Sequence, residues 1–247
     1  MNEYINLTLE NIDSEHICCA IADKKHYMGV ECKKEWIKSK LENEHVFRKL
    51  NVRGKVFIEY EPIETAWVPI KGKNYEYIYC LWVAGNFKGH GIGKELLEYC
   101  INDSKEKGMS GICTLVSKKK KPFIGEKKFF EHYGFKVVDT INDYELLALQ
   151  LNDKDTPEFN EKARKMKIDN KDFTIYYSNE CPYVEYSVKE LSEYAKENNI
   201  KINFIKIDTL EKAKNVPCIF NNWANFYKGK FISNTILNVK AFEKLIK

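Results

Sequence analysis

The segment from Tyr75 to Lys94 constrains the fold more than any other part of the chain. An apolar run from Tyr77 to Val83 predicts a buried strand, and the pattern Lys-Gly-His-Gly-Ile-Gly-Lys follows it at residues 88–94. An amphipathic pattern then predicts a helix that ends near Lys107. Glycine lets the backbone approach a ligand closely, and the first amides of a helix have no intrahelical partner. The order strand, glycine loop, helix therefore predicts an α/β fold that binds an anion, such as a pyrophosphate, where the helix starts.

Short apolar runs alternate with helical patterns over residues 1–151, which we expect to form the first domain. The expected strands are 5–9, 46–52, 55–61, 77–83, 112–116, 135–138 and 144–151, and the expected helices are 33–41, 94–107 and 126–133. Arg53-Gly54 divides two alternating runs, which predicts a hairpin whose strands both neighbour the opening strand. We also expect the strand 55–61 beside the strand 77–83.

Composition turns polar and charged at residues 152–171, which predicts a linker. Thr156-Pro157 has the form of a helix start, so part of this linker is expected to be helical. A second, smaller α/β domain is expected over 172–247. Its expected strands are 173–177, 201–207, 218–220 and 230–232, and its expected helices are 183–197 and 240–246.

The charge pattern and cysteine spacing exclude several classes of protein. The chain has 40 Lys and Arg against 36 Asp and Glu, but arginine occurs only at positions 48, 53 and 164, which argues against nucleic-acid binding. No apolar run approaches the roughly 18 residues of a membrane helix, and residues 1–10 lack the apolar core of a signal peptide, so we expect a cytoplasmic protein. The eight cysteines show no Cys-x-x-Cys spacing, so we expect no metal site and no disulfide framework.

Two motifs resemble those of the GCN5-related N-acetyltransferases, the GNAT superfamily. Leu81-Trp82-Val83 followed by residues 88–93 resembles the family's Arg/Gln-x-x-Gly-x-Gly/Ala turn after a hydrophobic strand, with Lys88 in the Arg/Gln place. Residues 129–135, Phe-Phe-Glu-His-Tyr-Gly-Phe, are similar to the family's Phe-Tyr-Glu-Lys-x-Gly-Phe segment. The resemblance covers residues 1–150 and implies a mixed central sheet flanked by helices.

The resemblance implies acetyl-CoA as co-substrate and direct attack of an amine on its thioester. The strand 77–83 would splay from the strand 112–116, and the gap would receive the pantetheine arm. Backbone N–H groups of Leu81 or Val83 would polarise the thioester carbonyl. The amides that would bind the pyrophosphate belong to Lys88, Gly89, His90, Gly91, Ile92, Gly93 and Lys94. A Cβ added at Gly91 or Gly93 is expected to obstruct this cradle.

The side chains that would move protons are less well defined by the resemblance. The family's frequent general acid is a tyrosine, and Phe130 occupies its place here; Tyr133 lies three residues on and is expected to pack in the core. The base often lies four or six residues before the Val83 position, which gives Tyr79 and Tyr77. A tyrosine is a weak base at neutral pH, so Glu59 and its neighbour Glu61 on the adjacent strand are alternatives.

The second domain carries Cys181-Pro182-Tyr183-Val184 after an expected strand. This resembles the Cys-Pro-Tyr-Cys loop of glutaredoxins in a thioredoxin-like fold, but Val184 replaces the second cysteine. Val216-Pro217 falls where that fold places its cis-proline. A helix start lowers the pKa of a thiol, so Cys181 is a possible reactive thiol. An acetyltransferase followed by such a segment resembles the YoaP-like acetyltransferases of bacteria.

Three functions remain open from the sequence. The leading one is an N-acetyltransferase acting on a primary amine of a small molecule or a peptide, with the C-terminal domain shaping specificity. The acidic strand containing Glu59 and Glu61 is a hint of a cationic acceptor. The alternatives are a thiol-dependent redox or binding module centred on Cys181 and a non-catalytic acyl-CoA sensor, which Phe130 suggests. The oligomeric state cannot be read from helix faces.

Overall fold

A computed structural model describes residues 2–17, 19–21, 23–121 and 124–246, and in it the chain packs into two compact units. The first unit comprises residues 1–21, 38–66 and 70–159, and the second comprises 22–37, 67–69 and 160–247. Helix α1 (Tyr27–Leu41) begins in the second unit and ends in the first. The boundaries expected at residues 151 and 172 did not anticipate that residues 22–37 pack with the C-terminal part.

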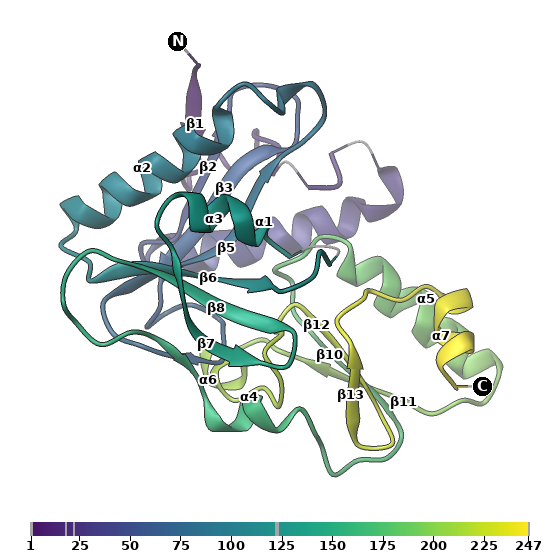
Figure 1. Cartoon of the computed structure of the whole chain (residues 1–247). Helices are drawn as coiled ribbons and strands as arrows, with labels where there is room; N and C mark the ends of the chain where they lie inside the picture. Colours follow the sequence, from purple (N-terminus) through teal and green to yellow (C-terminus); the bar gives the residue numbers. More distant parts are fainter. Residues whose placement is uncertain (1, 18, 22, 122–123, 247) are drawn as a thin grey trace. The chain divides into compact units, whose positions relative to one another are not determined.

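A mixed sheet of seven strands organises the first unit (Figure 1). The strand order is β1-β2-β3-β5-β6-β8-β7, and β5 and β6 are parallel whereas the other neighbours are antiparallel. The strands are β1 (Tyr4–Asn6), β2 (Val46–Leu50), β3 (Val56–Pro62), β5 (Tyr75–Val83), β6 (Gly111–Ser117), β7 (Lys136–Ile141) and β8 (Tyr144–Gln150).

The register of this sheet confirms two predicted pairings and corrects a third. Strands β2 and β3 form the predicted hairpin, and β3 lies beside β5. The expectation that both hairpin strands neighbour the opening strand is wrong for β3, because β2 lies between β1 and β3. Strand β2 pairs with β1 along one edge and with β3 along its other edge. Strand β3 therefore has no free edge of β1 to pair with on this side.

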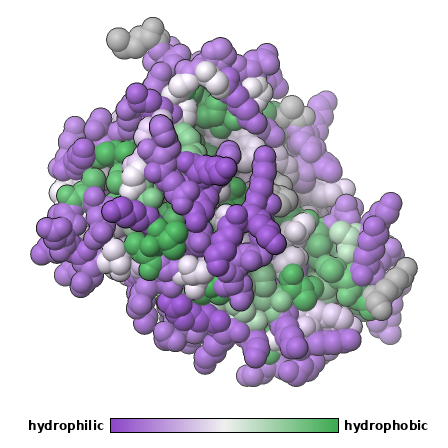
Figure 2. Space-filling view, viewed as in Figure 1, coloured by the Kyte–Doolittle hydropathy of each residue, from purple (hydrophilic) through white to green (hydrophobic). Residues whose placement is uncertain are grey.

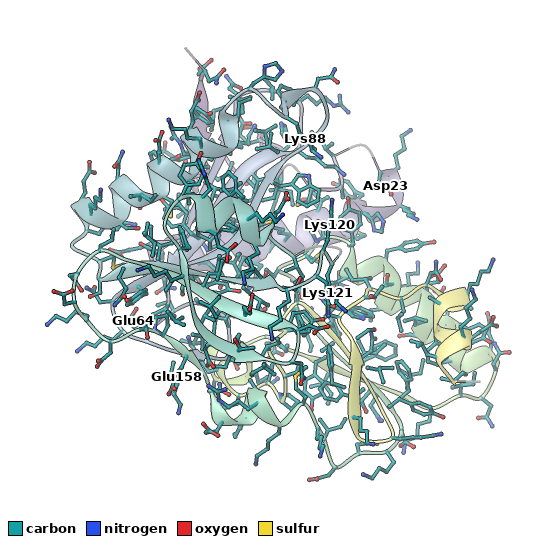
Figure 3. The ribbon with its side chains drawn as sticks, in the orientation of Figure 1. Asp23, Glu64, Lys88, Lys120, Lys121 and Glu158 are labelled. Carbon is teal, nitrogen blue, oxygen red and sulfur yellow. The ribbon has the colours of Figure 1, made fainter. Side chains whose placement is uncertain are left out.

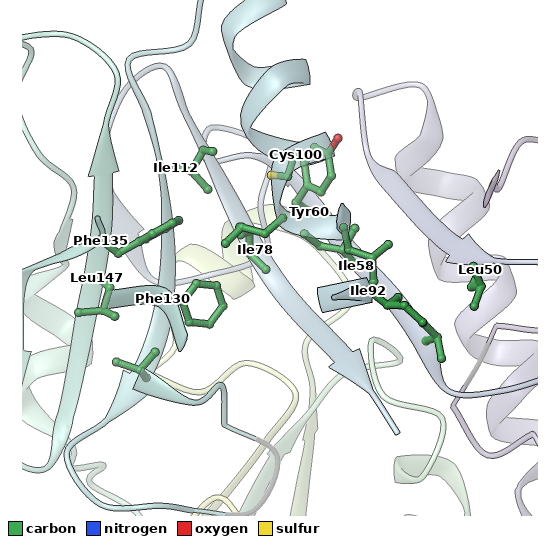
Figure 4. Close-up of a cluster of buried hydrophobic side chains, with 14 residues drawn as sticks. Leu50, Ile58, Tyr60, Ile78, Ile92, Cys100, Ile112, Phe130, Phe135 and Leu147 are labelled. Atoms are coloured by element: carbon green, nitrogen blue, oxygen red, sulfur yellow. The ribbon is translucent and has the colours of Figure 1, made fainter. Parts of the chain in front are cut away.

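Helices α2 (Ile92–Glu106) and α3 (Lys127–His132) cover one face of this sheet (Figure 1). The apolar stripe of α2, which includes Leu96, Leu97 and Cys100, packs on Ile58 and Ile78 of the sheet (Figure 4). Since these side chains repeat at helical spacing while β3 and β5 alternate, each element turns one apolar face to the same core.

A sheet of four strands organises the second unit, in the order β11-β10-β12-β13. Strands β10 and β11 are parallel, and β12 is antiparallel to both β10 and β13. The elements are α4 (Glu161–Lys165), β10 (Phe173–Tyr177), α5 (Val184–Glu197), β11 (Ile202–Lys206), α6 (Leu210–Lys214), β12 (Trp223–Tyr227), β13 (Lys230–Ser233) and α7 (Val239–Ile246). Residues of α5 and α7 pack on Phe173, Ile175 and Trp223.

Several local predictions in the C-terminal half are wrong. The strand expected at 218–220 lies instead at Trp223–Tyr227, and the Cys218 thiol donates to the Phe220 carbonyl over 3.3 Å within a loop. No helix starts at Thr156-Pro157, because β9 (Glu158–Phe159) pairs with β4 (Ile70–Lys71) and α4 begins after Asn160. The Asn160 side chain accepts the Ala163 N–H, which makes it the N-cap. All described peptide bonds are trans, so the cis-proline expected at Pro217 is not found.

Hydrophilic side chains cover most of the face drawn in Figure 2, as the lysine and glutamate content predicts. Within residues 2–17, 19–21, 23–121 and 124–246, no helix combines the length and the apolar character needed to span a membrane.

Candidate active site

Strands β5 and β6 stop pairing partway along their length, and we call the region between their carboxyl-terminal parts the gap; Gly125 lies beside Val116 on the edge of β6 that β5 has left. Their parallel pairing joins Tyr75–Ile78 to Gly111–Thr114, whereas β5 continues to Val83 and β6 to Ser117. The predicted splay is therefore confirmed. The carboxyl ends of both strands lie at this edge of the sheet, which is where open α/β sheets place ligands.

A β-bulge at Tyr79 coincides with the start of the gap. On the side of β3, Glu59 lies opposite Cys80 and Tyr60 opposite Ile78, so Tyr79 is an extra residue in β5. A bulge bends its strand and changes which face the later side chains occupy. The Thr114 hydroxyl donates to the Ile78 carbonyl over 3.0 Å and satisfies the last carbonyl of the parallel ladder before the strands part.

The backbone beyond the bulge points amides toward the gap. The Ala84 N–H donates to the Lys55 carbonyl in the loop before β3 over 3.0 Å. Because N–H groups alternate sides along a strand, those of Leu81 and Val83 point away from β3, on the side where β6 has departed. This orientation is the one that the predicted carbonyl-polarising role needs, and the role itself stays a prediction.

The glycine loop joins β5 to α2 through a short 3₁₀ turn at Gly85–Phe87. Gly89 and Gly91 have φ angles of 82° and 78°, in the left-handed region that favours glycine. Gly91 is the N-cap of α2, no side chain caps it, and the Glu95 N–H makes the first bond to its carbonyl, over 3.1 Å. The preceding amides of the helix have no intrahelical acceptor and are available to an anion.

Gly91 and Gly93 differ in what constrains each position. A Cβ built at Gly91 would meet nothing within 4 Å, so the constraint there is the left-handed backbone rather than an obstructing atom. A Cβ at Gly93 would make ordinary contacts with the Phe129 ring at 3.5 Å and with Val83 Cγ2 at 3.7 Å. A Cβ at Gly93 would therefore point toward half-buried side chains of the protein, and its effect on the cradle stays a prediction.

The same contact brings the two sequence motifs together, since Phe129 of the second motif lies beside Gly93 of the first. Phe130 is buried in the core and contacts Phe135, so it offers no proton to a leaving thiolate. Tyr133 packs against the same core, as expected. The side chain of Ile92 is also buried there, so Ile92 can serve the loop only through its backbone.

Lysines follow the carboxyl ends of both splayed strands, and of these Lys88 and Lys120 are exposed whereas Lys121 is half-buried. Lys88 lies on the loop after β5, and Lys120 and Lys121 lie on the loop after β6 (Figure 3). Lys121 is engaged by Asp143 at 3.7 Å and lies over the Tyr144 ring. His90 and Lys94 are also exposed, and Lys94 lies 3.7 Å from Glu98.

Tyr79 leads from the gap to a set of buried charged side chains, which we call the buried charge cluster: Lys40, His45, Glu59 and Glu61. The Tyr79 hydroxyl donates to Glu61 Oε1 over 2.6 Å. Lys40 Nζ lies 3.0 Å from the same oxygen, and His45 Nδ1 lies 3.1 Å from Glu61 Oε2. His45 Nε2 lies 3.3 Å from Glu59 Oε1.

The cluster balances its own charge. Burial lowers the pKa of His45, but the adjacent Glu59 and Glu61 carboxylates outweigh burial and raise it above its usual value. A protonated His45 and Lys40 then offset the two glutamates. Glu61 of the acidic strand therefore has Lys40 and His45 as partners within the protein, and the preference for a cationic acceptor stays a prediction. The bonding partners Lys40 and His45 were missed, because sequence spacing does not place them beside β3.

Tyr77 and Tyr79 lie side by side. Their rings are 5.2 Å apart in an edge-to-face arrangement, and Tyr77 is buried where β5 still pairs with β6. Tyr79 is the more accessible of the two and stands at the bulge. Of the three candidate catalytic side chains, Tyr79 is therefore the one that the fold brings to the gap, with Glu59 two contacts behind it.

Cys181 of the second unit is half-buried before α5. The backbone of Pro182 packs tightly on Gly29 of α1, where an added Cβ would lie 1.9 Å from the Pro182 carbonyl oxygen. Cys218, which follows Pro217, is fully buried, and burial raises the pKa of its thiol to about 12. Such a thiol is inert, so Cys218 does not supply the second reactive thiol of a dithiol pair.

The donor set fits an acyl-CoA and does not form a metal site in the part of the chain that the structure describes. Unpaired backbone amides at a helix start suit a pyrophosphate, and the gap beside them suits an extended arm. Across residues 2–17, 19–21, 23–121 and 124–246, histidine, cysteine and carboxylate side chains form no group arranged to hold a metal ion.

Comparison with known proteins adds independent findings. A sequence profile of the acetyltransferase (GNAT) domain matches residues 52–137, and a profile described as YoaP-like matches residues 201–244. The Bacillus subtilis (strain 168) protein named Uncharacterized N-acetyltransferase YoaP is 39% identical over 245 residues, covering 98% of each chain.

Two solved structures illustrate the more distant similarity. A GNAT family acetyltransferase from Brucella melitensis in complex with acetyl-CoA is 15% identical, with a TM-score of 0.42, over 65% of this chain and 94% of its own. The ribosomal-protein-S18-alanine N-acetyltransferase from Escherichia coli is 15% identical, with a TM-score of 0.44, over 63% of this chain and 97% of its own.

Proposed function

Because the chain belongs to the GNAT acetyltransferases, in their YoaP-like group, we propose that it moves an acetyl group from acetyl-CoA to a primary amine of a small molecule or a peptide by direct attack. The observation that carries this proposal is the gap that opens between β5 and β6 at Tyr79, with the glycine loop at its edge. A thioester bound there supplies an acetyl group that is already activated toward nucleophiles.

The backbone of this chain would hold the donor. We assign the pyrophosphate to the amides from Lys88 to Lys94, where Gly89 and Gly91 keep the loop in its left-handed conformation. The arm would extend along the gap, with the N–H groups of Leu81 and Val83 aimed at the carbonyl oxygen that gains negative charge during attack. The loop side chains at 88, 90 and 94 are exposed, so the lysines among them are available to the phosphates as well.

Tyr79 would receive the acceptor amine at the start of the gap, with Tyr77 lining the site and Glu59 supporting it through the buried charge cluster. The hydrogen bond from Tyr79 to Glu61 supports this assignment, since it fixes the orientation of a side chain that starts at the bulge. Phe130 cannot protonate the leaving thiolate, so the proposal leaves that step to solvent at the open edge of the gap.

The C-terminal unit is inferred to be a thioredoxin-like module that shapes specificity rather than a redox centre. The strand order β11-β10-β12-β13, with a helix joining the parallel pair, supports the fold. The family assignment does not favour the thiol-dependent reading of Cys181 or the non-catalytic sensor. A bacterial cytoplasmic setting is part of the proposal, and the Bacillus relative supports the bacterial part.

Calorimetric titration of acetyl-CoA into the wild type and into Gly91→Glu tests the proposal. The variant places a carboxylate where the pyrophosphate would lie and should weaken binding at least about 100-fold. Gly108→Glu is the matched control: Gly108 also has a positive φ of 69° and open space around it, but it follows the other end of α2. Equal binding by wild type and Gly91→Glu would remove the cradle.

A second measurement addresses the reaction. Release of free CoA across a panel of small amines and lysine-containing peptides should identify at least one acceptor for the wild type. Tight acetyl-CoA binding without CoA release on any amine would instead favour the alternative that the protein is a non-catalytic acyl-CoA sensor.

A further inference from the structure

The buried charge cluster places four ionisable side chains in the interior of the first unit. Lys40, His45, Glu59 and Glu61 are each at most 4% exposed, and burying charges is costly unless each is paired and hydrogen-bonded. All four come from one region of the first unit: the end of α1, the residue before β2, and strand β3. A function that depends on the cluster explains why the cost is tolerated.

Glu61 is the centre of this cluster. Its Oε1 receives the Tyr79 hydroxyl at 2.6 Å and faces Lys40 Nζ at 3.0 Å, and its Oε2 faces His45 Nδ1 at 3.1 Å. Lys40 is itself fixed, because it donates to the Thr65 carbonyl over 2.6 Å. The carboxylate is thus held from two sides by cations and cannot turn away from Tyr79.

This arrangement sets the direction of the hydrogen bond at Tyr79. Glu61 Oε1 accepts the hydrogen bond from the Tyr79 hydroxyl, and Lys40 Nζ approaches the same oxygen. The Tyr79 hydroxyl therefore uses its one proton in the hydrogen bond to Glu61. Toward any other group it can act only as a hydrogen-bond acceptor. A group that meets Tyr79 at the gap must bring its own N–H or O–H.

We propose that Glu61, fixed by Lys40 and His45, is a positioning residue that commits the Tyr79 proton, so that Tyr79 receives a hydrogen bond from the N–H of the acceptor. The inference rests on the proposed function and deepens it: Tyr79 selects acceptors by their hydrogen-bond donors, as a primary amine has, rather than by net positive charge. In the described part of the chain, Glu61 contacts Lys40 from α1, His45 before β2 and Tyr79 from β5; His45 also contacts Glu59 of β3, and Tyr77 lies beside Tyr79.

The hydrogen bond can be tested without knowing the acceptor. In protein labelled with ¹³Cζ-tyrosine, the resonance that disappears in Tyr79→Phe should shift in Glu61→Gln and in Glu61→Asp, which shortens the reach to Tyr79. Glu145→Gln is the matched control. Glu145 is a buried glutamate on β8, and its carboxylate lies 2.7 Å from Lys127 Nζ. A Tyr79 resonance that does not respond to Glu61 would overturn the proposal.

Kinetics with any amine that the wild type accepts give the second arm. Glu61→Gln and Tyr79→Phe should each lower kcat/KM for the amine on the order of 100-fold, with the Kd of acetyl-CoA unchanged. The double variant should be no slower than either single variant, since both changes remove one interaction. Glu145→Gln should lose stability but keep kcat/KM.

These outcomes separate the two proposals. Full activity in a folded Glu61→Gln, or additive losses in the double variant, would overturn the role of Glu61 while the acetyltransferase assignment stands. A wild type that acetylates no amine would overturn the proposed function, and with it the role of Tyr79 toward an acceptor, even if the NMR shift proves the hydrogen bond.

Discussion

Single buried charges in this protein differ in how fully they are paired. Glu61 lies within 3.1 Å of two cations, whereas Glu76 on β5 has Lys107 Nζ at 3.3 Å from Oε1. In the described part of the chain, no hydrogen-bond donor reaches Glu76 Oε2. Burial therefore dominates over the attraction to Lys107 and raises the pKa of Glu76 to about 7. The Glu76 carboxyl therefore changes its protonation state near neutral pH.

Glu76 predicts a pH dependence of stability with a definite sign. A carboxyl whose pKa is raised on folding stabilises the protein below its unfolded pKa of 4.5, and this contribution is lost as pH rises to about 7. The loss amounts to about 3 kcal/mol. Glu76→Gln cannot ionise, so its free energy of unfolding relative to wild type should rise by about that amount between pH 4.5 and 8.

Urea unfolding of both proteins at several pH values measures this difference. The wild type should show a pH-dependent loss across this range that the variant lacks. A difference between the two proteins that stays constant from pH 4.5 to 8 would show that Glu76 titrates normally in the folded state.

At the scale of elements, the end of one parallel ladder creates the site. β5 and β6 pair over four residues each and then part, and the bulge at Tyr79 lies at that point. Bulges bend strands and re-aim side chains, so one inserted residue both opens the gap and directs Tyr79 toward the buried charge cluster. The last carbonyl of the ladder, that of Ile78, is satisfied by the Thr114 side chain.

Thr114→Val should destabilise the protein by about 1–3 kcal/mol. Valine has the shape of threonine but no hydroxyl, so the Ile78 carbonyl would lose its partner in a buried position. Thr140→Val on β7 is the control, because Thr140 is exposed. Urea unfolding measures both changes, and equal losses of stability would mean that the Thr114 hydroxyl does not close the ladder.

At the scale of the whole molecule, two units with separate cores share one helix. The core of the first unit lies between its sheet and α2 and α3, and that of the second lies between its sheet and α5 and α7. Residues 27–37 of α1 group with the second unit and residues 38–41 with the first. The N-terminal segment therefore contributes to the packing of the C-terminal unit, from which it is distant in sequence.

Gly29→Ala tests this contribution. In an isolated helix, alanine in place of glycine stabilises by about 1 kcal/mol. Here the added Cβ would lie 1.9 Å from the Pro182 carbonyl oxygen, a backbone atom that cannot move aside cheaply, so the variant should instead lower Tm. Met28→Ala, at a neighbouring position that is 65% exposed, is the control. A Gly29→Ala protein as stable as wild type would mean that α1 does not dock on Pro182.

The sequence by itself determined the features that depend on neighbouring residues. The strand to Val83, the glycine loop and the start of α2 could be predicted because a glycine at positive φ and an apolar period are local requirements. The second motif near Phe129 was recognisable for the same reason. Local patterns gave a wrong prediction where a segment pairs with a partner distant in sequence. The helix start predicted at Thr156 is an example, because β9 there pairs with β4.

Only the tertiary structure decided how charges and helices are shared. Lys40, His45 and Glu61 come from three different elements or their ends, and they meet because strand register and α1 bring them to one buried point beside Tyr79. The strand alternation that put Glu59 and Glu61 on one face was readable, but the cations that neutralise them were not. An unpaired buried charge is costly, so each buried carboxylate needs a cation close to it in space. Which cation that is depends on the folded structure and not on the separation along the sequence.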